Sequence, residues 1–60
     1  MRIKLTCKNI KTDQTLIVDY NPDSWDHDVF ENGEFLGRLR LRELFFNGFE
    51  CVDKEFNYEY

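Results

Sequence analysis

The stretch VFENGEFL at residues 29–36 decides the fold, because it places an Asn-Gly pair between two short apolar runs. A two-residue hairpin turn needs a positive φ at both central positions, and Asn followed by Gly adopts that conformation most readily. With Asn32 and Gly33 at the tip, the sequence predicts an antiparallel hairpin. Its expected cross-strand pairs are Glu31 with Glu34, Phe30 with Phe35, and Val29 with Leu36.

Two more strands are predicted before this hairpin. Residues 2–8 alternate between an apolar and a polar face, which is the period of a half-buried strand. The apolar positions are Ile3, Leu5 and Cys7, and the polar positions are Arg2, Lys4, Thr6 and Lys8. A second strand fits residues 15–20, and the polar residues 9–14 suit the loop between the two. Asn21 and Pro22 end the second strand, because Pro cannot donate a hydrogen bond to a sheet.

The strand that leaves the hairpin also alternates. One face would carry Phe35, Gly37, Leu39 and Leu41, and the other would carry Arg38, Arg40 and Arg42. Residues 43–49 then fit two structures. In the first, a short helical turn ends at Asn47 and Gly48 takes the left-handed position after it. In the second, Asn47 and Gly48 form another hairpin, in which Arg42 faces Asp53 and Arg40 faces Glu55. The helical turn is favoured, because a compact sheet needs a sharp crossing before its last strand.

The last strand is predicted from Phe49 to about Tyr58, and its alternation breaks between Cys51 and Val52 in a way that fits a β-bulge. Residues 1–60 form a single small domain, since so short a chain has room for one core. The predicted class is mainly β: a five-stranded antiparallel meander or partly open barrel, with one short helical turn before the last strand. That order resembles a small SH3-like barrel in its architecture.

Composition limits the stability and the location of the chain. It has 60 residues, a net charge of −4 and ten aromatic residues, whose rings are expected to thicken the small core. Cys7 and Cys51 lie far apart with no CxxC pair and no second Cys or His at metal spacing, so both are expected to be reduced thiols. In a secreted protein, one bridge from the first strand to the last would be the only possible pairing, provided that the geometry allowed it. The absence of an apolar run long enough for a signal peptide or a membrane span predicts a cytoplasmic protein.

The sequence predicts no catalytic, metal or cofactor site. The carboxylates around His27 lack the spacing of a calcium-binding loop, and we expect them to favour the protonated form of this histidine. No nucleophile stands at a recognisable spacing from His27, and the three glycines do not form a phosphate-binding loop. The chain is therefore expected not to be an enzyme.

Acidic residues are segregated along the chain. Between Thr12 and Gly37 there are seven Asp or Glu residues and no Lys or Arg. Binding energy at interfaces concentrates in Trp and Tyr, while surrounding charge steers the encounter. We therefore predict a docking surface for a larger protein with a basic surface; the other interpretation is a merely solubilising face. The predicted partner-binding residues are Asp23, Trp25, Asp26, Asp28, Phe30, Glu31 and Glu34.

Three functional hypotheses follow from these features. In size, acidity and lack of catalytic groups the chain resembles the small proteins that phages and mobile elements use against host enzymes. That resemblance implies a non-enzymatic inhibitor or modulator of a larger host protein. The alternative is a nucleic-acid-binding small β-barrel that uses the Arg38–Arg42 strand, joined by the basic first strand if the two adjoin. Its net negative charge makes nucleic acid the weaker hypothesis. The third is a homo-oligomer formed through a strand edge.

Overall fold

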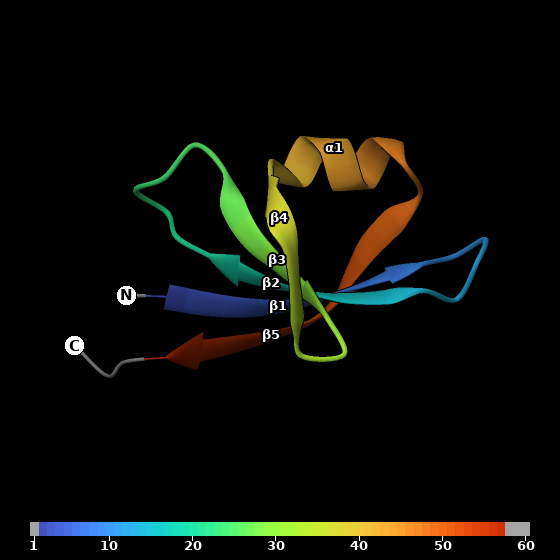
Figure 1. Ribbon diagram of the computed structural model, residues 1–60, viewed down its shortest axis with the longest axis horizontal. Coiled ribbons are helices and arrows are strands. Elements are labelled where there is room, and N and C mark those ends of the chain that lie inside the picture. The colour runs from blue at the N-terminus through green and yellow to red at the C-terminus, as the bar shows by residue number, and fades with distance from the viewer. Residues whose placement is uncertain (1, 58–60) are drawn as a thin grey trace.

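The computed structural model describes residues 2–57, which form one antiparallel sheet and a single helix (Figure 1). The elements are β1 (Arg2–Asn9), β2 (Thr15–Tyr20), β3 (His27–Glu31), β4 (Glu34–Leu39), α1 (Leu41–Phe46) and β5 (Phe49–Asn57). The predicted mainly β class, with five antiparallel strands and a short helix before the last one, is confirmed. The sheet is open and has the order β4-β3-β2-β1-β5, so β5 returns to pair with β1. Tyr58, the predicted end of the last strand, lies outside the described residues.

The β3–β4 hairpin has the predicted turn but not the whole predicted register. Asn32 and Gly33 have φ values of 52° and 82°, and Phe30 faces Phe35 as expected. Val29, however, faces Gly37 rather than Leu36, because a bulge shifts the register between these two pairs. Gly37 has a φ of 150°, a backbone conformation that residues other than glycine rarely adopt, so the glycine permits the bulge.

The predicted continuation of β4 through Leu41 and Arg42 is wrong, since the strand ends at Leu39 and α1 begins two residues later. Residues 43–49 therefore take the helical alternative, and the second hairpin with its arginine pairs to Asp53 and Glu55 does not form. Gly48 has a φ of 92°, and its N–H donates to the carbonyl of Phe45 at 3.2 Å. This is the left-handed helix end that the sequence predicts. No helix of residues 2–57 is long and apolar enough to cross a membrane.

The bulge predicted in the last strand is confirmed. Cys7 faces Cys51 and Thr6 faces Asp53, so Val52 is the extra residue of β5. On either side of it, β5 pairs with β1 over the whole length of the first strand, from Arg2 to Asn9. This long pairing places the helix end of β5, at Phe49, opposite Asn9 at the end of β1.

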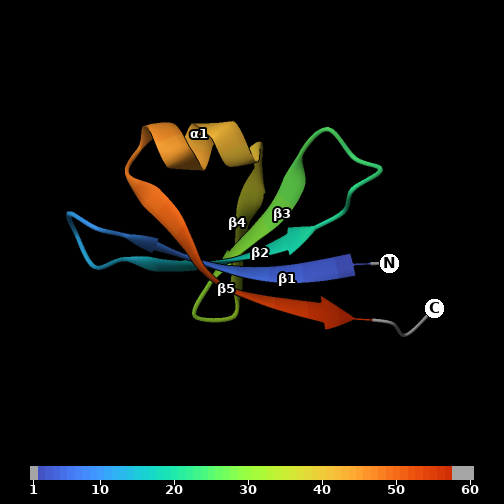
Figure 2. The same cartoon turned by 180° about the vertical axis from the view of Figure 1, so that it is seen from behind.

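The core lies between α1 and one face of the sheet, which we call the helix-covered face (Figures 1 and 2). Its buried residues are Leu5, Cys7, Leu16, Val18, Val29, Leu44 and Phe49. Phe49 is the only aromatic residue among them, so the expectation that aromatic rings would thicken the core is wrong for most of the rings that the structure describes. Trp25, Phe45 and Phe46 are instead among the exposed hydrophobic residues.

Candidate functional site

Five of the seven predicted partner-binding residues fall into two groups at opposite ends of β3. Asp23, Trp25 and Asp26 lie in the loop that precedes the strand, whereas Glu31 and Glu34 flank the turn that follows it. Five strand residues separate these ends by about 13 Å, at the usual rise of roughly 3.3 Å per residue. The remaining two, Asp28 and Phe30, lie on β3 itself. The fold therefore does not gather the predicted acidic surface around one point.

Two of these carboxylates share one guanidinium group. Arg38 contacts Asp28 at 3.2 Å through Nε and Asp26 at 3.4 Å through a terminal nitrogen. Glu31 accepts a hydrogen bond from the side chain of Gln14 at 3.1 Å. Among the described residues, no ion pair is found for Asp23 or Glu34.

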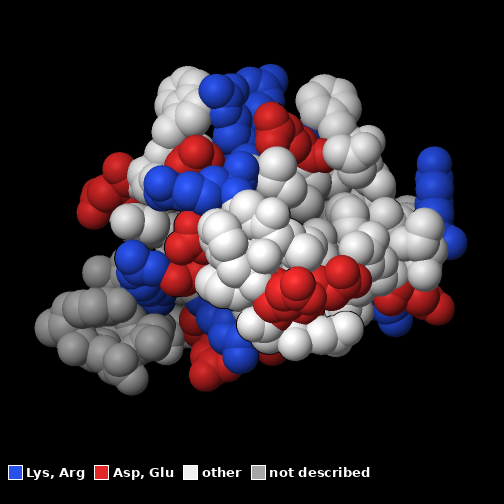
Figure 3. All heavy atoms as spheres, in the orientation of Figure 1, with Lys and Arg blue, Asp and Glu red and all other residues white. Residues whose placement is uncertain are grey.

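The face of the sheet away from α1, which we call the open face, carries a row of charges across all five strands. The row follows the strand register: Glu55 faces Lys4, Lys4 faces Asp19, Asp19 faces Asp28, and Asp28 faces Arg38. The one like-charge contact, between Asp19 and Asp28, is relieved because Arg2 bonds the first carboxylate and Arg38 the second. Figure 3 shows acidic and basic side chains intermixed on the visible surface.

The loop from 21 to 26 holds Trp25 outward. Four hydrogen bonds fix this loop: Ser24 N–H to the carbonyl of Asn21 (3.0 Å), Asp23 N–H to Asn21 Oδ1 (3.0 Å), Asn21 N–H to His27 Nδ1 (3.3 Å) and the Ser24 hydroxyl to the carbonyl of Asp26 (2.7 Å). Trp25 is nevertheless 73% exposed, and its ring stacks on the guanidinium of Arg40 at 4.4 Å from the ring centroid. A cation over a Trp face at this distance is an attractive contact. The exposed Trp25 ring is thus stabilised in this orientation by Arg40.

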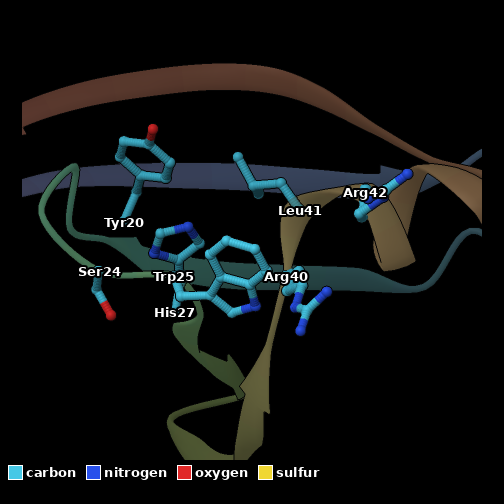
Figure 4. Close-up of a pocket in the computed structure, with 7 residues that line it drawn as sticks. All are labelled: Tyr20, Ser24, Trp25, His27, Arg40, Leu41 and Arg42. Carbon is cyan, nitrogen blue, oxygen red and sulfur yellow. The ribbon is translucent and has the colours of Figure 1, made fainter.

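Beside this ring is a hollow of about 370 Å³, which we call the Trp25 hollow. Figure 4 shows its lining, which comes from β2, the 21–26 loop and the start of β3 on one side and from the β4–α1 junction on the other. The lining residues are Tyr20, Ser24, Trp25, His27, Arg40, Leu41 and Arg42.

His27 forms part of the floor of this hollow and is only 6% exposed. Its ring packs against Tyr20 with centroids 4.4 Å apart, and its Nδ1 accepts the N–H of Asn21, which leaves the proton of the neutral ring on Nε2. Burial lowers the pKa of His27, and this outweighs the opposing charge of Asp26. The neighbouring carboxylates do favour the protonated form, as expected, but the loss of hydration on burial outweighs them and the net pKa is lowered.

Arg40 and Arg42 supply the cationic side of the Trp25 hollow. The Glu43 carboxylate accepts the backbone N–H of Arg40 at 3.4 Å, so the helix start is fixed while the guanidinium lies on Trp25. Within residues 2–57 neither Arg40 nor Arg42 has a carboxylate at ion-pair distance. Both cations are thus available to an acidic group from outside.

Exposed aromatic rings extend this surface along α1. Phe46 is 84% exposed, and together with Phe45 and Arg42 it lines a second hollow of about 340 Å³. Arg42 therefore stands between two hollows. We call the set Trp25, Arg40, Arg42, Phe45 and Phe46 the Trp25 surface.

A continuous basic face would require the Arg38–Arg42 segment to adjoin the basic strand β1, and the sheet order does not bring them together. Arg38 is held by carboxylates, and Arg40 and Arg42 lie beyond the end of β4. The basic strand β1 is separated from β4 by β2 and β3. The sequence predicted Trp25 as an anchor, which stays a prediction, and it missed Arg40 and Arg42 as neighbours of this ring, because the strand alternation assigned them to a different face.

Among residues 2–57, no three His, Cys, Asp or Glu side chains are grouped so as to hold a metal ion. Comparison with known proteins finds no matching protein-family model, no matching curated protein and no matching solved structure. A functional assignment therefore rests on the chemistry of the surface itself.

Proposed function

We propose that this protein is a non-enzymatic binding module that inhibits or modulates a larger protein, and that the Trp25 surface is its contact site. The observation that carries the proposal is a largely exposed tryptophan held in place by Arg40 at the rim of a hollow. Trp and Arg are enriched among the residues that dominate binding energy, and a fixed side chain loses little entropy on binding.

The chemistry of the surface indicates what the partner presents. An apolar side chain suits a hollow lined by Trp25, Tyr20 and Leu41, while a carboxylate suits Arg42, which has no ion pair among the described residues. Burying the exposed part of an indole ring, roughly 150 Å² at about 25 cal/mol/Å², stabilises a complex by about 3–4 kcal/mol. Loss of that ring should weaken binding by roughly 100- to 1,000-fold.

The earlier expectation of a basic partner rests on a different surface and stays a prediction. Asp23 and Glu34 are its cleanest probes, because neither has an ion pair within the described residues. Reversing the charge of Asp26 or Asp28 is less informative, since a lysine at either position would face Arg38 and strain the sheet.

Quantitative affinity purification from the native cell separates these proposals. Wild type is compared with Trp25→Ala, with Arg42→Glu, with the double variant Asp23→Lys and Glu34→Lys, and with Ile10→Ala as control. Ile10 is an exposed apolar residue in the β1–β2 loop and lies outside the Trp25 surface. Circular dichroism first establishes that every variant is folded.

A protein retained by wild type and by Ile10→Ala, but lost from Trp25→Ala and Arg42→Glu, would support the Trp25 surface. A protein lost only from the double variant Asp23→Lys and Glu34→Lys would indicate that the acidic residues, and not the Trp25 surface, form the binding site. Equal retention by all four variants would reject both surfaces. Cell fractionation in the same preparation tests the proposed cytoplasmic location.

A second candidate function is binding of single-stranded nucleic acid. It is favoured by one observation: Trp25, Tyr20 and two arginines without an ion pair to any described residue line the same hollow, and aromatic rings combined with Arg are how single strands are bound. Trp25 is the only tryptophan, so its fluorescence reports binding directly. Salt-sensitive quenching by short DNA or RNA at micromolar concentrations would favour this function over the protein partner.

A further inference from the structure

The two cysteines of the chain are brought face to face by the fold. They lie 44 positions apart in the sequence, yet Cys7 on β1 and Cys51 on β5 are directly opposite in the antiparallel register. Residues in that relation have Cα atoms about 4.5–5.5 Å apart and side chains on the same side of the sheet. A disulfide spans Cα distances of about 4.4–6.8 Å. Both thiols are free in the structure.

The neighbouring bulge gives this pair room to close. A disulfide brings the two Cβ atoms to about 3.5–4.5 Å, slightly closer than cross-strand partners usually stand. Val52, the extra residue of β5, follows Cys51 directly and interrupts the ladder there. A small shift of β5 at an edge of the sheet can therefore bring the sulfur atoms together, while β1 stays fixed between its two neighbours.

The two thiols differ in access. Cys7 is fully buried, and burial together with the nearby Cys51 raises the pKa of its thiol. Cys51 is partly exposed and lines a hollow of about 360 Å³ on the helix-covered face, beside Leu5, Leu41 and Phe45. Its Sγ–H donates to the carbonyl of Asp53 at 3.5 Å. A dissolved reagent therefore meets Cys51 first.

We propose that Cys7 and Cys51 form a reversible intramolecular disulfide in the folded protein, with a low-molecular-weight disulfide such as glutathione disulfide as the oxidant. The Cys51 thiolate attacks one sulfur of the oxidant, and one glutathione thiolate leaves. Cys7 then gives up its proton and attacks the Cys51 sulfur, and the second glutathione leaves. The two protein thiols lose two electrons and two protons in total, and the oxidant becomes two molecules of glutathione.

The bond would join a central strand to an edge strand. Because it closes a long stretch of chain, the oxidised protein should be harder to unfold. It would also fix the wall of the hollow that Cys51 lines. This inference does not depend on the identity of any partner.

The test treats the full-length native protein with glutathione disulfide and measures intact mass. The wild type should lose two hydrogens, and peptide mapping should find the segment around residue 7 linked to the segment around residue 51. Its melting temperature should rise by on the order of 10 °C or more, and dithiothreitol should reverse both changes. Cys7→Ser should instead retain one glutathionyl group, on Cys51, while Cys51→Ser should stay unmodified because its remaining thiol is buried.

Four results would overturn the proposal. They are glutathionyl adducts on the wild type without loss of two hydrogens, covalent dimers in place of the internal bond, formation of the bond only in denaturant, and a lower melting temperature after oxidation. Since a serine at a buried position can prevent folding, the wild-type peptide map decides the matter without the variants.

Discussion

Replacing Asn9 with Ala should lower the free energy of unfolding of this protein more than any substitution of comparable size in its loops. Asn9 is 7% exposed and ties the β1–β2 loop to the end of α1. Its Nδ2 donates to the carbonyl of Asn47 at 3.1 Å, and its Oδ1 accepts the N–H groups of Lys11 and Thr12 at 2.9 and 3.2 Å. Asn9→Ala removes all three bonds at once.

The magnitude follows from those contacts. Each bond contributes about 0.5–1.5 kcal/mol net, and loop groups that can turn to water recover part of the loss, so we expect about 2–3 kcal/mol. A 60-residue domain has only about 3–9 kcal/mol in total. Urea unfolding followed by circular dichroism measures the change, with an unaltered slope showing that the unfolded state is the same.

Two companion variants make the test specific. Asn9→Asp keeps the acceptor for the loop but loses the donor to Asn47, so it should show an intermediate loss. Lys11→Ala alters an exposed neighbouring side chain and should stay within about 0.5 kcal/mol of wild type. If Asn9→Ala were no less stable than Lys11→Ala, the role given to this side chain would be refuted.

Three further outcomes are expected. The pKa of His27 is lower in the folded protein than in the unfolded chain, so the unfolded chain takes up the proton first as the pH falls. The free energy of unfolding should therefore be at its full value above about pH 6.5 and decrease below it by at most about 1.4 kcal/mol per pH unit. Urea unfolding across this range should show the slope, and His27→Asn should remove it. Gly37→Ala should cost about 1–2 kcal/mol by thermal unfolding although the new methyl group meets no atom, because the strain lies in the backbone. Arg38→Met should leave Asp28 facing Asp19 without its cation and cost about 1 kcal/mol at low salt; an unchanged loss at high salt would contradict the electrostatic explanation.

Local signals in the sequence were sufficient for most elements and for both turns that depend on glycine. Asn32 and Gly33 define their turn by their own backbone preferences, and Gly48 ends α1 for the same reason. The bulge after Cys51 is visible as a break in alternation. In β4 the adjacent apolar residues Phe35 and Leu36 also break the alternation, but the register was predicted from the Asn-Gly turn alone, so the shift opposite Val29 was missed.

Contacts between distant segments were beyond sequence reasoning. Strand β5 could have followed β4 at the edge of a strict meander, and only the crossing through α1 brings it to β1. For the same reason the stacking of Arg40 on Trp25 was not foreseen, because it joins a loop to the end of a strand that the alternation extended too far. Trp25 itself was predicted as a binding residue from its residue type and its polar neighbours, and its exposure is compatible with that prediction.

The segregation of charge along the chain has a structural explanation in the sheet. On the open face β1 is basic, β2 and β3 are acidic, β4 contributes Arg38, and β5 is acidic again. Opposite charges then meet at three of the four strand boundaries in the row that runs from Glu55 to Arg38. Shifting any strand by one residue would turn its charges toward the core, so the same pattern that looks like an acidic block in the sequence helps to fix the register.

The protein therefore has two surfaces with different properties. On the open face, Arg2 and Arg38 compensate the carboxylates of Asp19 and Asp28, so this part of the acidic stretch offers an incoming protein little uncompensated charge. On the other side of the sheet, three of the exposed rings, Trp25, Phe45 and Phe46, lie near two arginines that have no ion pair within the described residues. Uncompensated cations and exposed rings in one place are what a partner can stabilise by binding. For that reason the Trp25 surface, rather than the acidic stretch of the sequence, is the better site for a first mutation.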